Sequence, residues 1–194
     1  GHSERILAQA LKGHRDEVVI ATKFGNKFDE TTKQIIGEMT TPPNIRTACE
    51  ASLRRLNTDH IDLLQFHLND YDPALAVEVR ETLETLVSIG LIRAYGWSTD
   101  FPDRARVFAE GEHNTSIQFN LNVISDNSKV LAIAEHHDLA AICRGPLAMG
   151  LLTGKYSTST VQDAADVRRN TPEWLEWFTG GRAKPQFLYS LDLI

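Results

Sequence analysis

Short apolar segments alternate with longer amphipathic segments along most of this 194-residue chain. Five of the short segments are almost continuously apolar over about five to seven residues, which is typical of parallel strands covered on both faces. These predicted strands are residues 18–24, 61–67, 92–98, 116–121 and 139–143. Because parallel strands need a long crossover connection, this alternation restricts the chain to an α/β fold with a parallel sheet.

The segments between the predicted strands have helical spacing and recognisable ends. Gly13 and Gly90 end two of them, and Pro43 and Pro73 stand near the starts of two. The predicted helices are residues 4–12, 45–56, 73–89, 102–110 and 127–137. The order is therefore one helix followed by five βα units, joined by right-handed crossovers.

Two parallel architectures are compatible with this order. A doubly wound sheet that binds dinucleotides carries a Gly-rich turn after an early strand, but Gly25 stands there without a G-x-G-x-x-G motif. A (β/α)₈ barrel instead gathers polar residues at the carboxyl ends of its strands. Such residues are Lys23, His67, Ser98, Gln118, Asn120 and Arg144. The sequence therefore predicts a TIM-type (β/α)₈ barrel, incomplete here, with about five parallel βα units.

Composition and charge exclude several classes of protein. The 42% of hydrophobic and 24% of charged residues are typical of a globular chain. A net charge of −6 at pH 7 disfavours nucleic acid and membrane surfaces as partners, and no apolar run approaches the roughly 20 residues of a membrane span. Cys49 and Cys143 lie in apolar stretches without metal-ligand spacing. We expect two reduced core cysteines, no metal site and a cytoplasmic protein.

Lys23 and His67 are the first candidates for chemistry. Each ends a predicted strand, and neighbouring parallel strands lie about 4.8 Å apart, so we expect both side chains at one mouth of the sheet. A lysine beside a histidine lowers the pKa of a neighbouring acid or polarises a carbonyl oxygen. Each residue also has a structural alternative: a lysine that extends from the sheet into water, and a histidine satisfied within the core.

Six segments resemble those of the aldo-keto reductases, in the same order. They are residues 1–7, 20–25, 52–56, 61–67, 96–98 and 145–156, the last reading Gly-Pro-Leu-Ala-Met-Gly-Leu-Leu-Thr-Gly-Lys-Tyr. The resemblance covers about residues 1–156. It implies a (β/α)₈ barrel that uses a nicotinamide cofactor, usually NADPH, to reduce a small-molecule aldehyde or ketone. NADH stays open as the cofactor, because the family's contacts to the 2′-phosphate would follow Ile194.

The resemblance also implies catalytic roles. The family uses an Asp, a Tyr, a Lys and a His: the Tyr donates a proton, the Lys lowers its pKa, and the His orients the substrate oxygen. Lys23 and His67 match the Lys and the His. The Asp and the Tyr would precede Gly1, and a closed barrel needs three further strands. Residues 1–194 alone are therefore expected to be inactive as a reductase.

Six further residues match cofactor-binding positions of the family. Ser98 and Gln118 would hydrogen-bond the nicotinamide carboxamide, and Thr99 stands where the family often has Asn. Arg144 replaces an aromatic that stacks on the nicotinamide in many members, and a guanidinium also stacks. The loop along the pyrophosphate would contain Leu147, Gly150 and Lys155. The structural alternatives are a turn serine, a buried glutamine, an ion-paired arginine and turn glycines.

We expect residues 1–156 to form the partial barrel and residues 157–194 to form a long loop on the active-site side and the start of a C-terminal helix, within the same domain. The leading function is NADPH-dependent carbonyl reduction. The alternatives are a non-enzymatic cofactor-binding barrel that serves as a regulatory or partner-binding subunit, and a fragment without a stable fold of its own. The oligomeric state stays open, and a homo-oligomer is compatible with the sequence.

Overall fold

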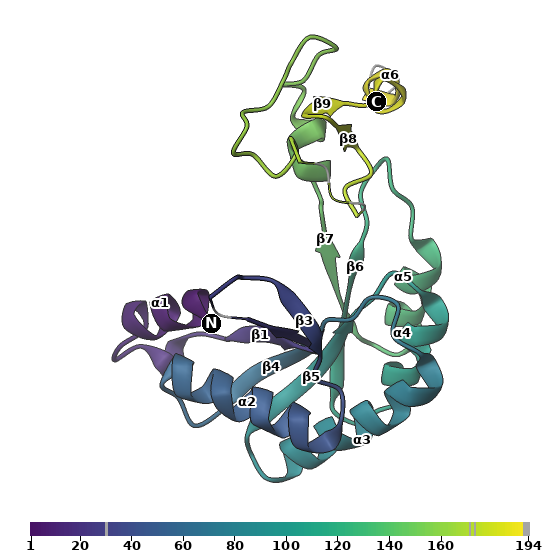
Figure 1. The fold of residues 1–194 in the computed structure, drawn as a ribbon. Coiled ribbons are helices and arrows are strands. Elements are labelled where there is room, and N and C mark those ends of the chain that lie inside the picture. The colour runs from purple at the N-terminus through teal and green to yellow at the C-terminus, as the bar shows by residue number, and fades with distance from the viewer. Residues whose placement is uncertain (30, 171, 173, 192–194) are drawn as a thin grey trace. The chain divides into compact units, whose positions relative to one another are not determined.

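The computed structural model describes residues 1–29, 31–170, 172 and 174–191 of the chain. These residues form two compact units (Figure 1). The first unit comprises Gly1–Phe119 and Ser128–Ile142, and the second comprises Asn120–Asn127 and Cys143–Ile194. Each unit has a hydrophobic cluster of its own.

The largest sheet has five strands in the order β1-β4-β5-β6-β7. Their bounds are Ala21–Phe24 for β1, Ile61–Phe66 for β4, Ile92–Ser98 for β5, Asn114–Asn120 for β6 and Ala140–Arg144 for β7. The pairs β1–β4, β4–β5 and β5–β6 are parallel, as predicted. The carboxyl ends of these strands therefore meet at one edge of the sheet.

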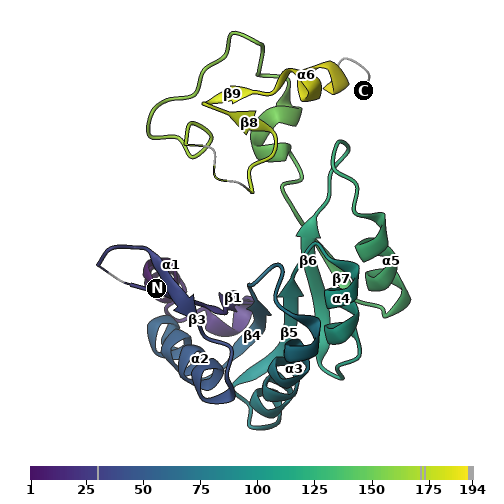
Figure 2. The same cartoon turned by 45° about the vertical axis from the view of Figure 1, so that its right-hand side comes forward.

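Helices separate the parallel strands along the chain, in the predicted order. They are α1 (His2–Ala10), α2 (Pro42–Leu56), α3 (Pro73–Ser88), α4 (Pro102–Ala109) and α5 (Ser128–His136). Three of them begin at a proline, whose missing N–H has no helical partner to lose at that position. Asp72 caps α3 by accepting a hydrogen bond of 2.8 Å from the Ala74 amide. Figures 1 and 2 show α2 to α5 on one face of the sheet.

The structure differs from the sequence prediction after α1. β1 begins at Ala21 rather than at residue 18, because Arg15–Glu17 form a short 3₁₀ helix, η1, and the Ile20 amide donates to the Asp62 carboxylate at 2.9 Å. An antiparallel pair, β2 (Asn26–Phe28) and β3 (Ile35–Glu38), follows β1 and was not predicted. These short strands are mostly exposed, so no alternation of apolar and polar residues marks them in the sequence.

Phe66 lies at the centre of the first unit's core. Its ring centroid lies 5.2 Å from that of Phe24, 5.2 Å from Tyr71, 5.1 Å from Trp97 and 6.0 Å from Phe108. Aromatic pairs at these distances contribute about 0.5–1.5 kcal/mol each beyond the burial of their area. The cluster joins three strands to α4 and to the loop before α3, and so holds the helices against the sheet.

The two cysteines have different surroundings. Cys49 is fully buried on α2, where burial and then the charge of Glu50 raise the pKa of its thiol to about 11. Cys49 is a core residue, as predicted, and its raised pKa makes the thiol unreactive. Cys143 is exposed, and the prediction of a core position for it was wrong. β7 is the last strand in the sheet order and Ala140 and Ala141 on it are also exposed, so apolar composition alone did not lead to burial there.

Two ion pairs hold the amino-terminal elements of the first unit. Asp62, near the start of β4, accepts hydrogen bonds from Arg15 Nη2 at 2.8 Å and from the Ile20 amide at 2.9 Å. Glu4 of α1 accepts from Arg55 Nε of α2 at 2.5 Å and from Thr22 Oγ1 of β1 at 2.8 Å. Both carboxylates are largely buried, so their hydrogen bonds are shielded from water.

The second unit has its own small core around a hairpin. Its elements are η2 (Ala148–Thr153), β8 (Phe178–Thr179), β9 (Arg182–Ala183) and α6 (Pro185–Leu191). Gly180 and Gly181 connect β8 to β9 with φ of 55° and 80°, which matches a two-residue hairpin turn that glycine adopts without strain. The predicted C-terminal helix begins with α6, and residues 192–194 lie outside the described residues.

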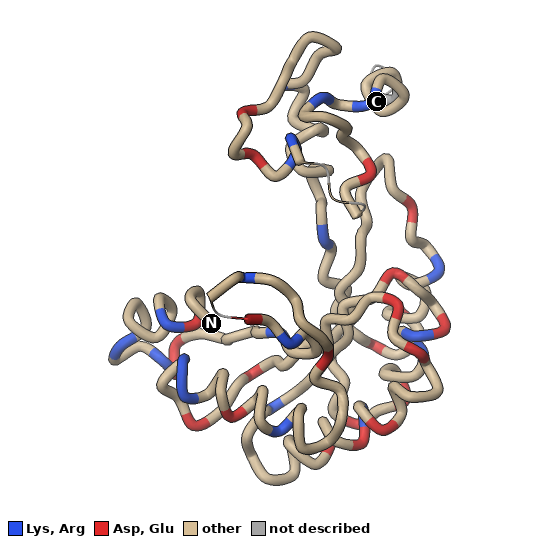
Figure 3. Tube along the Cα trace, viewed as in Figure 1, with Lys and Arg blue, Asp and Glu red and all other residues tan. Residues whose placement is uncertain are grey.

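Charged residues of both signs are interspersed over the helices of the first unit (Figure 3). None of the helices in the described part of the chain is long and apolar enough to cross a membrane.

The core makes a first prediction about stability. Leu83 of α3 is fully buried, whereas Leu75 of the same helix is 57% exposed. Leu83→Ala is expected to lower the free energy of unfolding by about 2–5 kcal/mol, because it leaves a cavity. Leu75→Ala is expected to change it by less than about 0.5 kcal/mol. Urea denaturation measures both values, and equal losses in the two variants would contradict this packing.

The hydrogen bonds that Asp62 accepts from Arg15 and from the Ile20 amide lead to a second prediction, on how acid affects the stability of the fold. Burial by itself raises the pKa of Asp62, but the hydrogen bonds from the Ile20 amide and from Arg15 outweigh it, and the pKa lies below its ordinary value. A lowered pKa in the folded state means that the stabilisation is complete above about pH 4 and is lost as the pH falls through the folded-state pKa.

Asp62→Asn is therefore expected to reduce the loss of stability on acidification below about pH 4, and to cost about 1.5–3 kcal/mol near neutral pH. Asp16→Asn is the control, because Asp16 is exposed on the neighbouring η1. Unfolding free energies measured between pH 2 and 7 check both variants, and an unchanged pH profile in Asp62→Asn would refute the assignment.

Candidate active site

The predicted site residues of the first unit lie along one edge of the parallel sheet. In the ladder, Lys23 of β1 pairs with Gln65 of β4, Gln65 pairs with Gly96 of β5, and Ser98 pairs with Gln118 of β6. All of these positions are at or near the carboxyl ends of their strands. This is the edge at which parallel α/β folds bind ligands.

Lys23 and His67 lie on neighbouring strands at the same end, as predicted. Lys23 is the third residue of the four-residue β1, and His67 directly follows β4. The His67 amide donates to the Phe24 carbonyl at 2.9 Å, so the two strands stay paired up to this point. Asn26 Nδ2 donates to the His67 carbonyl at 3.0 Å and holds the turn after β4. Both side chains are exposed.

Strand alternation decides which way these side chains face. Phe24 and Phe66 pack into the helix-covered core, with their ring centroids 5.2 Å apart. Because successive side chains point to opposite faces of a strand, Lys23 and Gln65 face the other side of the sheet. The aromatic core therefore determines the direction of the candidate catalytic lysine.

Gln65 is a residue of this edge that the sequence did not single out. Its side chain is 1% exposed, and its Nε2 has no hydrogen-bond partner within the described residues. Buried amide donors are rarely left without a partner in native proteins. The sequence does contain a signal for this residue. Gln65 is a polar residue inside a mostly apolar strand, and it lies two residues before His67, on the same face of the strand.

Ser98 and Gln118 are brought together as predicted. Ser98 is 1% exposed at the end of β5, and its Oγ donates to Gln118 Oε1 at 3.2 Å. The Thr99 amide donates to the Gln118 carbonyl at 2.9 Å and extends the pairing of the two strands. The half-buried Gln118 thus presents an amide whose oxygen is already held by Ser98.

Thr99 joins the end of β5 to the loop that follows His67. Its side chain is fully buried; its Oγ1 donates to the Asn69 carbonyl at 2.6 Å and accepts from the Phe101 amide at 3.3 Å. Asn69 Oδ1 accepts in turn from the Asp100 amide at 2.8 Å. The threonine therefore has a structural role at this edge, which the sequence did not indicate.

Tyr95 is the fully buried tyrosine of β5, and it lies away from this edge. Its hydroxyl donates to Glu84 Oε1 at 2.5 Å, and Glu84 Oε2 lies 2.6 Å from His113 Nδ1. Burial, and then the hydrogen bond and charge of Glu84, raise the pKa of Tyr95 well above its ordinary value. A hydroxyl held in this way on the helix-covered side is unsuited to give a proton to a substrate at the carboxyl edge.

The remaining predicted cofactor residues belong to the second unit. Arg144 ends β7, Leu147 precedes η2 and is 56% exposed, and Lys155 is exposed after η2. Gly150 has a φ of 93°, and a Cβ there would lie 3.2 Å from the Tyr156 hydroxyl. The turn at this position therefore requires glycine for its own conformation.

Comparison with known proteins identifies the family. A family model described as "Aldo/keto reductase family" matches residues 1–188. The chain is 33% identical over 180 residues to "Aldo-keto reductase YhdN" of Bacillus subtilis (strain 168), covering 90% of this chain and 53% of that protein. It is 31% identical over 185 residues to "NADH-specific methylglyoxal reductase" of Escherichia coli (strain K12), covering 85% of this chain and 54% of that protein.

Solved structures agree with the sequence relatives. The glycerol dehydrogenase of Gluconobacter oxydans matches with a TM-score of 0.79 and 32% identity, covering 99% of this chain and 58% of that chain. An aldo/keto reductase of Klebsiella pneumoniae, solved in complex with NADP and acetate, matches with a TM-score of 0.62 and 26% identity, covering 78% of this chain and 51% of that chain.

The chain belongs to the aldo/keto reductase family. The parallel sheet and these structural relatives confirm the predicted fold class, an incomplete TIM-type barrel. The chain spans about half the length of the curated relatives it matches.

The hydrogen bonds of Thr99 lead to a prediction about the stability of the loops at the carboxyl edge of the sheet. Thr99→Val removes the hydroxyl but keeps the shape, and leaves the Asn69 carbonyl and the Phe101 amide without their partner. We expect a loss of about 1–3 kcal/mol in the free energy of unfolding and faster amide exchange at Asp100 and Phe101. Thr115→Val, at the exposed position of β6, is the control and is expected to change neither. Unchanged exchange in Thr99→Val would contradict the structural role.

Proposed function

We propose that the protein is an NADPH-dependent oxidoreductase that reduces a small aldehyde or ketone to the alcohol. The observation that carries the proposal is the common edge of Lys23, His67, Ser98 and Gln118 on consecutive strands of an aldo/keto reductase chain. The proposal places the protein in the cytoplasm, with a carbonyl compound as its partner and no role for nucleic acid or membrane.

Lys23 and His67 have distinct roles in this proposal. A lysine ammonium near a phenol stabilises the phenolate, and so prepares a tyrosine to donate its proton to the substrate oxygen. The imidazole of His67 holds that oxygen by a hydrogen bond and orients the carbonyl for attack. The family's Asp and Tyr positions would precede Gly1, so we propose that residues 1–194 by themselves do not turn over substrate.

The residues present fit a nicotinamide cofactor. Ser98 Oγ already donates to Gln118 Oε1, which orients the Gln118 amide and leaves its Nε2 to donate to the oxygen of a carboxamide. When bound, the cofactor supplies the hydride for the reduction. Arg144 would stack on the nicotinamide ring, and the pyrophosphate would lie along Leu147, Gly150 and Lys155.

We further propose that residues 1–156 act as the barrel part of this enzyme and residues 157–194 as a loop and helix on its active-site side. Relatives differ in the cofactor that their names state: the Escherichia coli relative is called NADH-specific, and a Schizosaccharomyces pombe relative carries NADP(+) in its name. Titrations with NADPH and with NADH in parallel therefore test the choice of cofactor.

Gln118→Ala tests the cofactor site. The variant removes the carboxamide contact, and we expect the dissociation constant of NADPH to rise about fivefold, which corresponds to roughly 1 kcal/mol. Fluorescence titration measures the constant. Gln9→Ala, on the exposed surface of α1, is the matched control and is expected to bind as the wild type does. Equal affinities of the two variants would remove Gln118 from the site.

Turnover tests the reaction itself. Residues 1–194 are compared with a chimaera that carries the corresponding segments of YhdN ahead of Gly1 and after Ile194, and NADPH oxidation is followed with short aldehydes and ketones. We expect both proteins to bind NADPH, but only the chimaera to oxidise it. His67→Ala is expected to slow the chimaera by a factor of about 10²–10⁴.

The outcomes separate the two candidate functions. A chimaera that binds NADPH and reduces none of the carbonyl compounds would favour a non-enzymatic, cofactor-binding regulatory subunit. A protein that binds neither NADPH nor NADH would refute both.

A further inference from the structure

A groove between α4 and α5 lies on the helical side of the first unit, away from the carboxyl edge of the sheet. It has a volume of about 340 Å³ and is lined by Arg106, Lys129, Ala132, Ile133, His136 and His137. This volume lies within the range of about 300–1,000 Å³ that is common for small-molecule sites. Four of the six lining side chains are basic or are histidines, in a chain whose net charge is −6.

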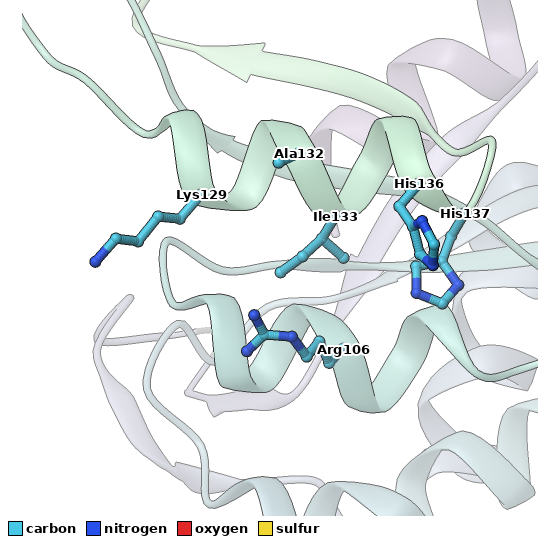
Figure 4. A pocket seen from close by; sticks show the side chains of 6 residues that line it. All are labelled: Arg106, Lys129, Ala132, Ile133, His136 and His137. Carbon is cyan, nitrogen blue, oxygen red and sulfur yellow. The ribbon is translucent and has the colours of Figure 1, made fainter.

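Helical spacing brings the basic side chains of α5 to one face. Lys129, Ile133 and His136 follow one another at intervals of four and three residues, whereas Glu135 falls on a different face of the helix. Figure 4 shows the amino group of Lys129 at one end of the groove, the two imidazoles at the other, and the Arg106 guanidinium reaching from α4 between them.

The carboxylates nearest to Arg106 along α4 are engaged by other arginines. Asp103 lies 3.1 Å from Arg104 Nη1 through each of its oxygens, and Glu110 lies 3.1 Å from Arg80 Nη1. In the described part of the chain, no carboxylate lies within ion-pair distance of Arg106 or Lys129. The described part of the chain therefore does not neutralise the positive charge of Arg106 and Lys129.

The two ends of the groove differ in chemistry. Arg106 and Lys129 offer several charged N–H donors near the start of α5, and such donors recognise phosphate oxygens well. Ala132 and the buried Ile133 form an apolar floor next to them. The imidazoles of His136 and His137 close the other end, with their ring centroids 4.9 Å apart in a T-shaped pair that presents an aromatic surface.

We propose that this groove binds a phosphate monoester with a planar organic group. The phosphate lies between Arg106 and Lys129, and the organic group lies over Ala132 and Ile133 against the imidazoles. The imidazoles also donate an N–H in either protonation state, so binding does not require them to be charged. The site is separate from the proposed cofactor site, since none of its lining residues lies at the carboxyl edge of the sheet.

Titration with phenyl phosphate and with inorganic phosphate tests the proposal. The experiment uses the labelled 194-residue protein at pH 7 and about 0.15 M ionic strength, where screening weakens unspecific attraction to surface charge. We expect saturable shifts of the His136 and His137 side-chain NMR signals with phenyl phosphate. Inorganic phosphate is expected to bind several-fold more weakly and to shift these signals less, because it lacks the ring.

Two variants and two controls make the test specific. Arg106→Gln is expected to weaken phenyl phosphate binding by at least about tenfold. Ala132→Glu places a carboxylate in the groove on an exposed helical position and is expected to abolish binding while the protein stays folded. Arg54→Gln removes a charge from an exposed position on α2, and Gln118→Ala alters the proposed cofactor site; both are expected to leave binding unchanged.

The opposite results would overturn the proposal. Binding that does not saturate, or that weakens equally in Arg54→Gln and Arg106→Gln, would show general attraction to positive charge only. Equal affinity for the two phosphates, with unmoved histidine signals, would refute a site for an organic monoester. A loss of phenyl phosphate binding in Gln118→Ala would move the ligand to the cofactor site.

Discussion

The packing of Phe66 against four aromatic rings determines which face of each central strand is covered by helices. Phe24, Phe66 and Trp97 all point from their strands into that core. Because side chains alternate along a strand, the residue before each of them faces the other side of the sheet. Lys23, Gln65 and Gly96 are those residues, and the parallel register holds them side by side. A shift of one strand by a single residue would exchange the two sets.

The two ends of the sheet are used differently. At the amino-terminal ends, two carboxylates each have several partners: Asp62 is held by Arg15 and by the Ile20 amide, and Glu84 bonds both Tyr95 and His113. The buried side chain of Asn114, the first residue of β6, has no partner within the described residues. At the carboxyl end, Gln65 keeps a buried amide donor without a partner within the described residues. Satisfied groups stabilise a fold, and the donor of Gln65 is open to a ligand because it lies at the edge where parallel α/β folds bind ligands.

The charged side chains on the outer helices also differ in whether they are paired. Several charged side chains on α2 to α4 are ion-paired, as Arg46 is with Glu50 and Arg80 with Glu110. In the groove beside α5, the carboxylates nearest to Arg106 along the chain, Asp103 and Glu110, are paired with other arginines. Arg106 therefore keeps a charge that these two carboxylates do not neutralise.

The sequence by itself determined the α/β class, the order of the strands and helices, and the placing of Lys23 and His67 at one end of neighbouring strands. Periodicity and end signals are local properties, and they carry this information directly. Only the tertiary structure showed that Cys143 is exposed, that the polar segment after β1 forms a hairpin, and that Gln65 is buried with no partner for its amide nitrogen among the described residues. These features depend on which elements pack against each residue. A local pattern does not encode that, because burial is decided by contacts between segments far apart in the chain.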